Sequence, residues 1–301
     1  MSTLQGLTAV VTGAGRGLGR EHALLLAELG ARVVVNDNGA APDGSGDDAA
    51  PARQVAAEIT ERGGEAVAHT GSVSDWNTAD ELIGLAVGTY GGLDILVNNA
   101  GILRDRTLAN MTEQEWDSVI DVHLKGHFCP LRHAAAYWRG EAKAGRPRRA
   151  AVVNTSSGSG LRGNPGQANY ASAKAGIAML TIVAARELER YGVRSNAIAP
   201  VARTRLTSAT PGLGDRLEAS GDGGFDPWHP ENVSPLVAYL ASPDCHLSGR
   251  VFSVMGGHIG LQQSWTESDP FDVSERKWTV DEIAQAMKDL PAGPDEFRMS
   301  A

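Results

Sequence analysis

The chain has 301 residues, 42% of them apolar, and its 27 Lys and Arg against 36 Asp and Glu give a formal net charge of −9. This composition can bury a large core and excludes a disordered chain, and the acidic balance without a basic stripe argues against nucleic-acid binding. The two cysteines match no metal-ligand spacing, no apolar run reaches the roughly 18 residues of a membrane span, and the N-terminus shows no signal peptide, so we expect a cytoplasmic protein with no metal and no membrane partner.

Short apolar runs alternate with helical periodicity along most of the chain. Strands are expected at 7–11, 31–36, 65–69, 93–97, 150–154, 194–199 and 250–254. Helices are expected at 17–29, 76–90, 113–138, 168–191 and 232–241. A further helix is expected to pass through Glu58 and to end at Gly63. Strands that are uninterrupted apolar runs are buried on both faces, as in a parallel sheet covered by helices. We therefore predict an α/β fold, a Rossmann-type doubly wound parallel sheet of seven strands with helices on both faces.

The chain divides into one large domain and a tail. Residues 1–262 are predicted to form a single Rossmann-type domain, in which residues 201–230, rich in Gly, Ser, Pro and Asp toward their end, form a mobile excursion near the substrate. Residues 263–301 are predicted to be a C-terminal tail with a short helix. Thr279 and Glu282 match a capping box, and an apolar stripe follows that is expected to pack on the body or on a sister subunit, formed by Ile283, Met287 and Leu290.

The first strand runs into a glycine-rich loop that precedes a helix. Gly13, Gly17 and Gly19 give the spacing G-x-x-x-G-x-G, and Leu18 stands where the strict G-x-G-x-x-G pattern has its third glycine. Glycines let the backbone approach a pyrophosphate closely, and the N–H groups and dipole of the following helix stabilise its charge. The loop therefore predicts a dinucleotide site, with a merely tight strand–helix turn as the alternative.

Two charged residues bear on the choice of dinucleotide. Asp37 ends the second strand, 24 residues after Gly13, where a carboxylate can accept hydrogen bonds from the adenosine ribose hydroxyls. A 2′-phosphate there would meet like charge, which favours NAD over NADP. Arg16 in the glycine loop argues the other way, because a basic residue can bind a 2′-phosphate. We weigh Asp37 more heavily and expect NAD, although Asp37 as a simple strand-end turn residue is an alternative.

A tyrosine and a lysine lie four residues apart at the start of a predicted helix. Tyr170 and Lys174 therefore face the same side, and Ser157 follows the fifth strand at the sheet edge where open α/β folds bind ligands. A tyrosine with its usual pKa of about 10 is a poor base at neutral pH. An adjacent ammonium and an oxidised nicotinamide are expected to lower that pKa by about 3 units. Alone the pair could be a surface pair, but with the glycine loop and Ser157 it predicts proton transfer at a dinucleotide.

These motifs resemble the short-chain dehydrogenase/reductase family over residues 5–260. The resemblance rests on Thr12–Gly19, Asn98–Gly101, Ser157, Tyr170 and Lys174. It implies that Tyr170 is the general base, Ser157 holds the substrate oxygen and Lys174 binds the nicotinamide ribose. It also implies a homodimer or homotetramer. The residues that we expect to contact the cofactor are Gly13, Arg16, Gly17, Leu18, Gly19, Asp37, Ser72, Val73, Asn99, Ala100, Gly101, Tyr170, Lys174, Pro200 and Thr204.

The sequence departs from the family pattern at several positions. His123 stands where the family usually has an asparagine, in the long central helix whose kink holds a water of the proton relay. It is either a catalytic relay residue that titrates near neutrality or a packed helix histidine. Pro200 is followed by Val201 instead of glycine, and Arg205 occupies the place of the usual threonine. Thr204 is therefore the candidate nicotinamide contact in that loop.

Several of these features are similar to one branch of the family. The stretch 122–124, the long glycine-rich loop after Asp37, and the stretches 98–106 and 257–260 resemble the (3R)-hydroxyacyl-CoA dehydrogenase unit of peroxisomal multifunctional enzyme type 2, or 17β-hydroxysteroid dehydrogenase type 4. The branch implies NAD-dependent oxidation of a secondary alcohol, either a (3R)-hydroxyacyl-CoA, with or without a steroid side chain, or a hydroxysteroid. The alternatives are an NADPH-dependent 3-ketoacyl or ketone reductase and a non-catalytic dinucleotide-binding regulator.

Charged and aromatic residues are expected near the mouth of the cleft. Four arginines there could pair with coenzyme A phosphates, since guanidinium groups suit phosphate oxygens, or could be solvated surface residues: Arg104, Arg106, Arg203 and Arg205. Phe225 and Trp228 could cover an apolar acyl or steroid group or could anchor their own loop.

Overall fold

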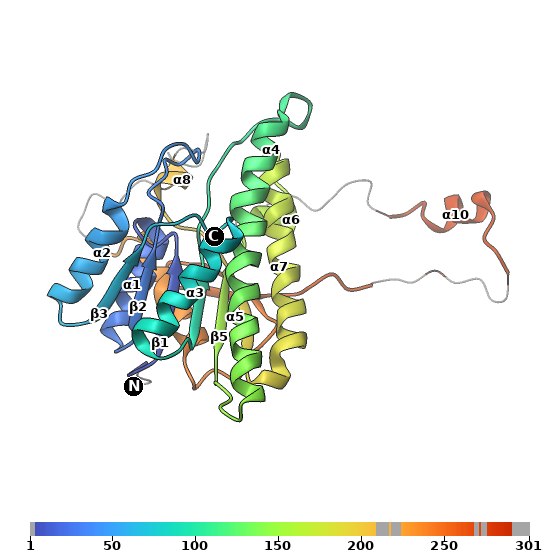
Figure 1. Ribbon diagram of the computed structural model, residues 1–301. Helices are drawn as coiled ribbons and strands as arrows, with labels where there is room; N and C mark the ends of the chain where they lie inside the picture. The colour runs from blue at the N-terminus through green and yellow to red at the C-terminus, as the bar shows by residue number, and fades with distance from the viewer. Residues whose placement is uncertain (1–3, 209–216, 218–223, 268–270, 272–275, 291–301) are drawn as a thin grey trace.

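The computed structural model describes residues 4–208, 217, 224–267, 271 and 276–290. Within them the chain forms one eight-stranded sheet in the order β3-β2-β1-β4-β5-β6-β7-β8 (Figure 1). The strands from β1 to β7 pair in parallel, and β8 is antiparallel to β7. The strand bounds are β1 Thr8–Thr12, β2 Arg32–Asn36, β3 Glu65–His69, β4 Ile95–Asn98, β5 Ala151–Thr155, β6 Arg194–Pro200, β7 Val251–Met255 and β8 His258–Gln262. This confirms the predicted doubly wound α/β fold.

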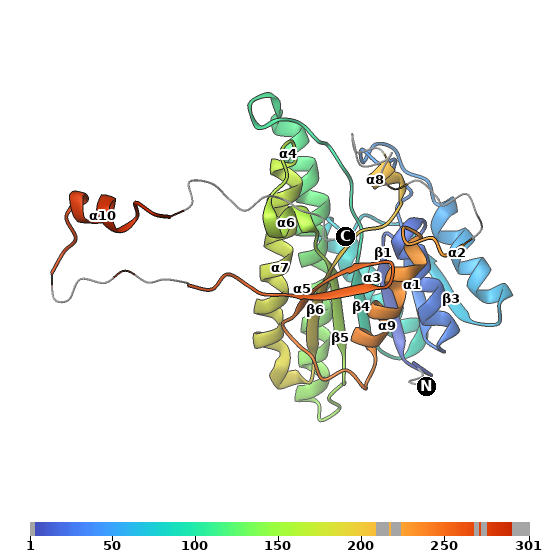
Figure 2. The same cartoon turned by 180° about the vertical axis from the view of Figure 1, so that it is seen from behind.

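Helices cover both faces of the sheet (Figures 1 and 2). One layer contains α1 (Gly17–Glu28), α2 (Ala50–Glu61) and α9 (Ser234–Ala241), in which α1 contacts both others. The opposite layer contains α3 (Trp76–Tyr90), α5 (Gly126–Lys143) and α7 (Ala168–Leu188), in which α5 contacts both others. Shorter helices are α4 Glu113–Ile120, α6 Gly158–Arg162, α8 Arg205–Ser208 and α10 Val280–Ala286.

The strands separate two hydrophobic cores because successive side chains point to opposite faces of a sheet. Val11 and Val35 belong to the core under α1, α2 and α9, whereas Val10 and Val34 belong to the core under α3 and α5. All four side chains are fully buried. Burial on both faces is why these strands are continuous apolar runs in the sequence.

Local signals set the ends of several helices. Asp75 caps α3 by accepting a hydrogen bond from the Thr78 amide at 2.8 Å, and the helix ends at Gly91 with a φ of +78°. The helix α4 begins with a complete capping box between Thr112 and Glu115. The capping box predicted for the tail is also present, and it begins α10.

Two elements differ from the prediction. The sheet has an eighth strand, because Gly256 and Gly257 form a tight turn, with a φ of +51° at Gly256, that sends β8 back along β7. The helix predicted over 113–138 is interrupted by a π-helical turn at Asp121–Lys125, after which α5 continues to Lys143. The π turn inserts an extra residue into the helix, a feature that is common at functional sites.

Parts of the predicted excursion and tail fall outside the described residues, namely 209–216, 218–223, 268–270, 272–275 and 291–301. Figure 1 shows α10 well apart from the sheet and its helices. Its stripe is partly exposed, at 38%, 50% and 46% for Ile283, Met287 and Leu290.

Both cysteines are free and buried. No helix in the described part of the chain is long and apolar enough to cross a membrane.

Candidate active site

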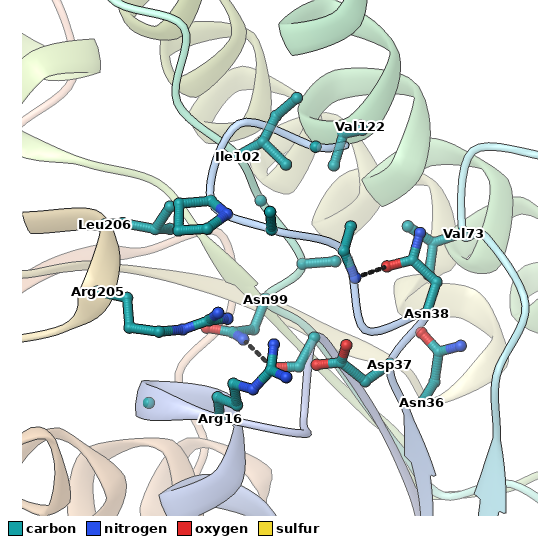
Figure 3. A pocket seen from close by; sticks show the side chains of 18 of the residues that line it. Arg16, Asn36, Asp37, Asn38, Val73, Asn99, Ile102, Val122, Arg205 and Leu206 are labelled. Atoms are coloured by element: carbon teal, nitrogen blue, oxygen red, sulfur yellow. Dashed lines mark hydrogen bonds between the residues drawn. The ribbon is translucent and has the colours of Figure 1, made fainter. Parts of the chain in front are cut away.

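A pocket lies at the carboxyl ends of the strands where the strand order reverses (Figure 3). β1 pairs with β2 on one side and β4 on the other, which places the crevice between their following loops. Of the predicted cofactor residues, those that line this pocket are Gly13, Arg16, Gly17, Leu18, Asp37, Ser72, Val73, Asn99, Ala100, Gly101 and Thr204. Gly19, Pro200, Tyr170 and Lys174 are not among its lining residues.

The glycine loop packs so closely that two of its glycines admit no side chain. A Cβ on Gly13 would lie 2.7 Å from the Cα of Ala100, and a Cβ on Gly19 would lie 2.2 Å from the carbonyl oxygen of Gly13. The Asn99 side-chain amide donates to the carbonyls of Thr12 and Gly13, at 3.1 Å in each case. The glycines therefore let the β1 loop and the β4 loop meet at the floor of the pocket.

Asp37 is held at the edge of the pocket by backbone amides. Its Oδ2 accepts from the Gly15 amide at 2.8 Å and its Oδ1 from the Gly39 amide at 2.6 Å. Two guanidinium groups lie near this carboxylate in Figure 3. Arg16 reaches Asp48 only at 3.9 Å, and the pKa of Arg205 is lowered by burial and then by the neighbouring Arg16. An acid at the strand end, a glycine cradle and two cations fit the ribose and phosphates of a dinucleotide.

The structure brings together Ser157, Tyr170 and Lys174. Ser157 caps α6 directly after β5, and its Oγ accepts from the Ser159 amide at 3.2 Å. Tyr170 and Lys174 lie one turn apart in α7, with the Lys174 Nζ 5.5 Å from the centre of the tyrosine ring. The Nζ of Lys174 also donates to the carbonyl of Thr155 at 2.6 Å.

Burial dominates the protonation of this group. It raises the pKa of the Tyr170 phenol to about 12, against a smaller lowering by the hydroxyl of Ser157. Burial also lowers the pKa of Lys174 to about 7. In the protein without its cofactor, the tyrosine pKa therefore lies above its usual value, and the lowering expected with an oxidised nicotinamide beside it stays a prediction. The reason is that desolvation disfavours the charged form of both residues more than either charge favours the other.

His123 lies in the π turn and contacts Tyr170 edge-on, with ring centres 5.0 Å apart. Its Nε2 lies 2.7 Å from the carbonyl oxygen of Ile102 and 3.1 Å from the amide nitrogen of the same residue. Burial, followed by the charge of Lys174, holds the pKa of His123 well below its usual range. This lowering favours the packed-histidine interpretation over a residue that titrates near neutrality, and the role of His123 in catalysis stays a prediction. Its contacts link the loop after β4 to Tyr170 in α7.

The arginines at the cleft mouth differ in their contacts. Arg106 makes an ion pair with Glu115 at 2.9 Å, Arg203 makes one with Asp226, and the Arg104 guanidinium donates to the carbonyl of Asp43 at 2.8 Å. Arg205 lines the pocket itself. Trp228 is partly buried and Phe225 is 67% exposed.

Several residues of the site were not among the predicted cofactor contacts. Thr12, which stood only in the motif that carries the family resemblance, ends β1, and its hydroxyl accepts from the amides of Asn99 and Ala100, at 2.9 and 3.2 Å. The loop after Asp37 supplies Asn38 and Gly44 to the pocket wall. The signal for Thr12 was its place between a buried strand and the first glycine. The contacts of the loop are tertiary and leave no local pattern.

A doubly wound sheet with this cradle, this carboxylate and a grouped serine, tyrosine and lysine defines an oxidoreductase that uses a nicotinamide dinucleotide. The family model for short chain dehydrogenases matches residues 7–211. The chain therefore belongs to the short-chain dehydrogenase/reductase family, whose members act on CH–OH groups, as its motifs predicted.

Two relatives and one solved structure place the chain within this family. It is 48% identical over 295 residues to hydroxyacyl-CoA dehydrogenase ChsB1 of Mycobacterium tuberculosis, covering 97% of this chain and 90% of that protein. It is 44% identical over 252 residues to peroxisomal multifunctional enzyme type 2 of Drosophila melanogaster, covering 84% of this chain and 39% of that protein. The structure of a short chain dehydrogenase from Mycobacterium avium is similar with a TM-score of 0.84 at 50% identity, covering 96% and 95% of the two chains. These relatives confirm the predicted resemblance to the hydroxyacyl-CoA branch.

Proposed function

We propose that the protein oxidises a secondary alcohol to a ketone with NAD, and that its substrate class is (3R)-hydroxyacyl-CoA, with or without a steroid side chain. The observation that carries the choice of NAD is Asp37, whose two oxygens are held by the amides of Gly15 and Gly39 at the edge of the dinucleotide pocket. A fixed carboxylate suits two ribose hydroxyls and repels a 2′-phosphate. The substrate class is supported by the similarity to a hydroxyacyl-CoA dehydrogenase along nearly the whole chain.

The catalytic roles in this proposal follow from the grouping of three side chains. Tyr170 takes the proton of the substrate hydroxyl, Ser157 donates a hydrogen bond to the same oxygen, and Lys174 binds the nicotinamide ribose and favours the phenolate through its charge. A bound NAD supplies the hydride acceptor for this oxidation. Because burial raises the pKa of Tyr170 to about 12, the phenol keeps its proton at neutral pH until positive charge beside it favours the phenolate.

A second candidate is an NADPH-dependent reductase of ketones or 3-ketoacyl thioesters. It is favoured by Arg16, which lines the pocket near Asp37 and could pair with a 2′-phosphate. Membership of an enzyme family argues against the third alternative, a non-catalytic regulator.

The test is a fluorescence titration with NADH and NADPH, followed by a screen of hydroxyacyl-CoA thioesters and hydroxysteroids monitored by NADH absorbance. We expect NADH to bind at least tenfold more tightly and (3R)-hydroxyacyl-CoA to be oxidised. Tyr170→Phe is expected to lose most turnover and to keep NADH affinity within a few-fold. Tighter binding of NADPH would favour the reductase, and full turnover by Tyr170→Phe would refute the assigned base.

A further inference from the structure

The carbonyl that binds Lys174 belongs to a group of three buried polar residues, Asn98, His127 and Thr155, which we call the His127 cluster. Asn98 ends β4, Thr155 ends β5 and His127 lies in the first turn of α5, and their exposed fractions are 0%, 6% and 0%. Within the described part of the chain, both ring nitrogens of His127, Oδ1 of Asn98 and Oγ1 of Thr155 make no hydrogen bond. Buried polar atoms without partners are rare in native proteins, and both ring nitrogens of one fully buried histidine indicate a specific role.

The cluster adjoins the catalytic lysine. The Thr155 carbonyl that accepts from the Lys174 Nζ at 2.6 Å also faces the imidazole of His127. The carbonyl groups of His123 and Asn98 face the same ring. The Asn98 side-chain amide donates to the His127 carbonyl at 3.4 Å, which ties the first turn of α5 to the end of β4.

The protonation state of His127 defines which partners it can take. Burial, followed by the charge of Lys174, holds the pKa of His127 well below its usual range, so the ring is neutral and has one N–H donor and one acceptor nitrogen. The surrounding carbonyl groups can accept the N–H. The acceptor nitrogen requires a donor instead, and the donor offered on this side is the Lys174 Nζ, which bonds to the Thr155 carbonyl that faces the ring. A lysine ammonium has three N–H groups, of which the Thr155 carbonyl takes one.

We propose that His127 is a positioning residue for Lys174: its neutral imidazole accepts a hydrogen bond from the lysine Nζ through one bridging water, and so stabilises the charged amine. The proposal rests on the proposed function only where it predicts an effect on kcat, because its effect on the pKa of Lys174 does not depend on the substrate. The titratable groups that face His127 and Lys174 are His123 from the π turn and Tyr170 from α7, while β4 and β5 contribute the uncharged Asn98 and Thr155. Loss of the acceptor is therefore expected to make the lysine a weaker base, by about one pH unit.

The first test needs no substrate. Urea unfolding is measured from pH 5.5 to 9 for four proteins: wild type, Lys174→Met, His127→Leu and the double variant. Two differences in the free energy of unfolding isolate the titration of Lys174. One is between wild type and Lys174→Met, and the other is between His127→Leu and the double variant. In the His127→Leu background, this difference is expected to begin changing about one pH unit lower than in the wild-type background. Superimposable difference curves would overturn the proposal, whatever the enzyme oxidises.

The second test is kinetic and uses a matched control. His22 is also fully buried with one unpartnered ring nitrogen, but its other nitrogen bonds to Ser234 in a different part of the fold. On the substrate identified by the screen, His127→Leu is expected to lower kcat at least about tenfold and to shift its pH profile. His127→Gln should restore most of the rate, and His22→Leu should leave the profile in place. An unchanged pH profile in a folded His127→Leu variant that binds NADH would contradict the proposal, while failure of the wild type on every substrate would contradict only the proposed function.

Discussion

Replacement of Lys174 by methionine is expected to stabilise the protein while it abolishes turnover. Lys174 is 2% exposed, and burial lowers its pKa from 10.5 to about 7. A pKa change of this size lowers the free energy of unfolding by about 5 kcal/mol at pH values where Lys174 is protonated in the unfolded chain, because burial disfavours the same charge in the folded protein. Methionine keeps the length of the apolar stem. Its loss of the bond to the Thr155 carbonyl costs about 1–3 kcal/mol, so the net gain at pH 7 is about 2–4 kcal/mol.

The pH dependence of this gain has a definite sign. The unfolded chain binds the Lys174 proton up to its usual pKa of 10.5, whereas the folded protein releases it near pH 7. The penalty is therefore complete below pH 7 and disappears as the pH rises through the interval up to 10.5. Relative to Lys174→Met, the wild type is expected to gain about 2 kcal/mol of unfolding free energy between pH 7 and pH 9.

The measurement is urea unfolding followed by circular dichroism at pH 7 and pH 9, at one protein concentration for all variants. Lys143→Met is the control, because Lys143 is an exposed residue at the end of α5. It should show neither the gain nor its pH dependence. If Lys174→Met were less stable than the wild type, or if both proteins responded equally to pH, the desolvation argument for Lys174 would be wrong.

Two further variants test the dinucleotide pocket. Asp37→Ser removes the carboxylate that the Gly15 and Gly39 amides hold. The Kd for NADH, measured by fluorescence, should therefore rise at least tenfold while the Kd for NADPH falls. An unchanged preference between the two dinucleotides would refute the role of Asp37. Gly19→Ala places a Cβ 2.2 Å from the Gly13 carbonyl oxygen, so both NADH affinity and Tm should fall. Gly88→Ala in α3 meets nothing within 4 Å and should keep NADH affinity and raise Tm slightly, and equal effects of the two alanines would refute the cradle argument.

The sequence predicts the fold well where one strong local signal acts alone. β1, β2, β4 and β5 are largely apolar runs buried on both faces, and helices between the strands end at glycines or begin at caps such as Asp75. β8 has no such run, since Ile259 and Leu261 alternate with polar residues and glycine and are 55% and 56% exposed. The π turn has no local pattern either, and only the family resemblance placed a kink of the central helix at His123.

The members of the proposed catalytic group are predictable from spacing, but their pKa values are not. A separation of four residues on a helix fixes that Tyr170 and Lys174 share a face, whatever surrounds them. Their pKa values depend instead on how completely other elements exclude water, and the short bond from Lys174 to the Thr155 carbonyl comes from a different strand. His127 illustrates the same limit, because the packing of α5 against β4 brings its ring to the Thr155 carbonyl that binds the lysine.

The segment that follows β4 connects the dinucleotide pocket to the catalytic group. At one end, the Asn99 side chain bonds to the carbonyls of Thr12 and Gly13 and so fixes the glycine loop. At the other end, a Cβ on Gly101 would lie 2.4 Å from the His123 ring, which in turn contacts Tyr170 edge-on. A side chain at Gly101 would therefore have to push against the histidine that contacts the tyrosine. Because Gly101 also lines the dinucleotide pocket, the absence of a side chain at this one position serves both the pocket and the packing of His123 against Tyr170.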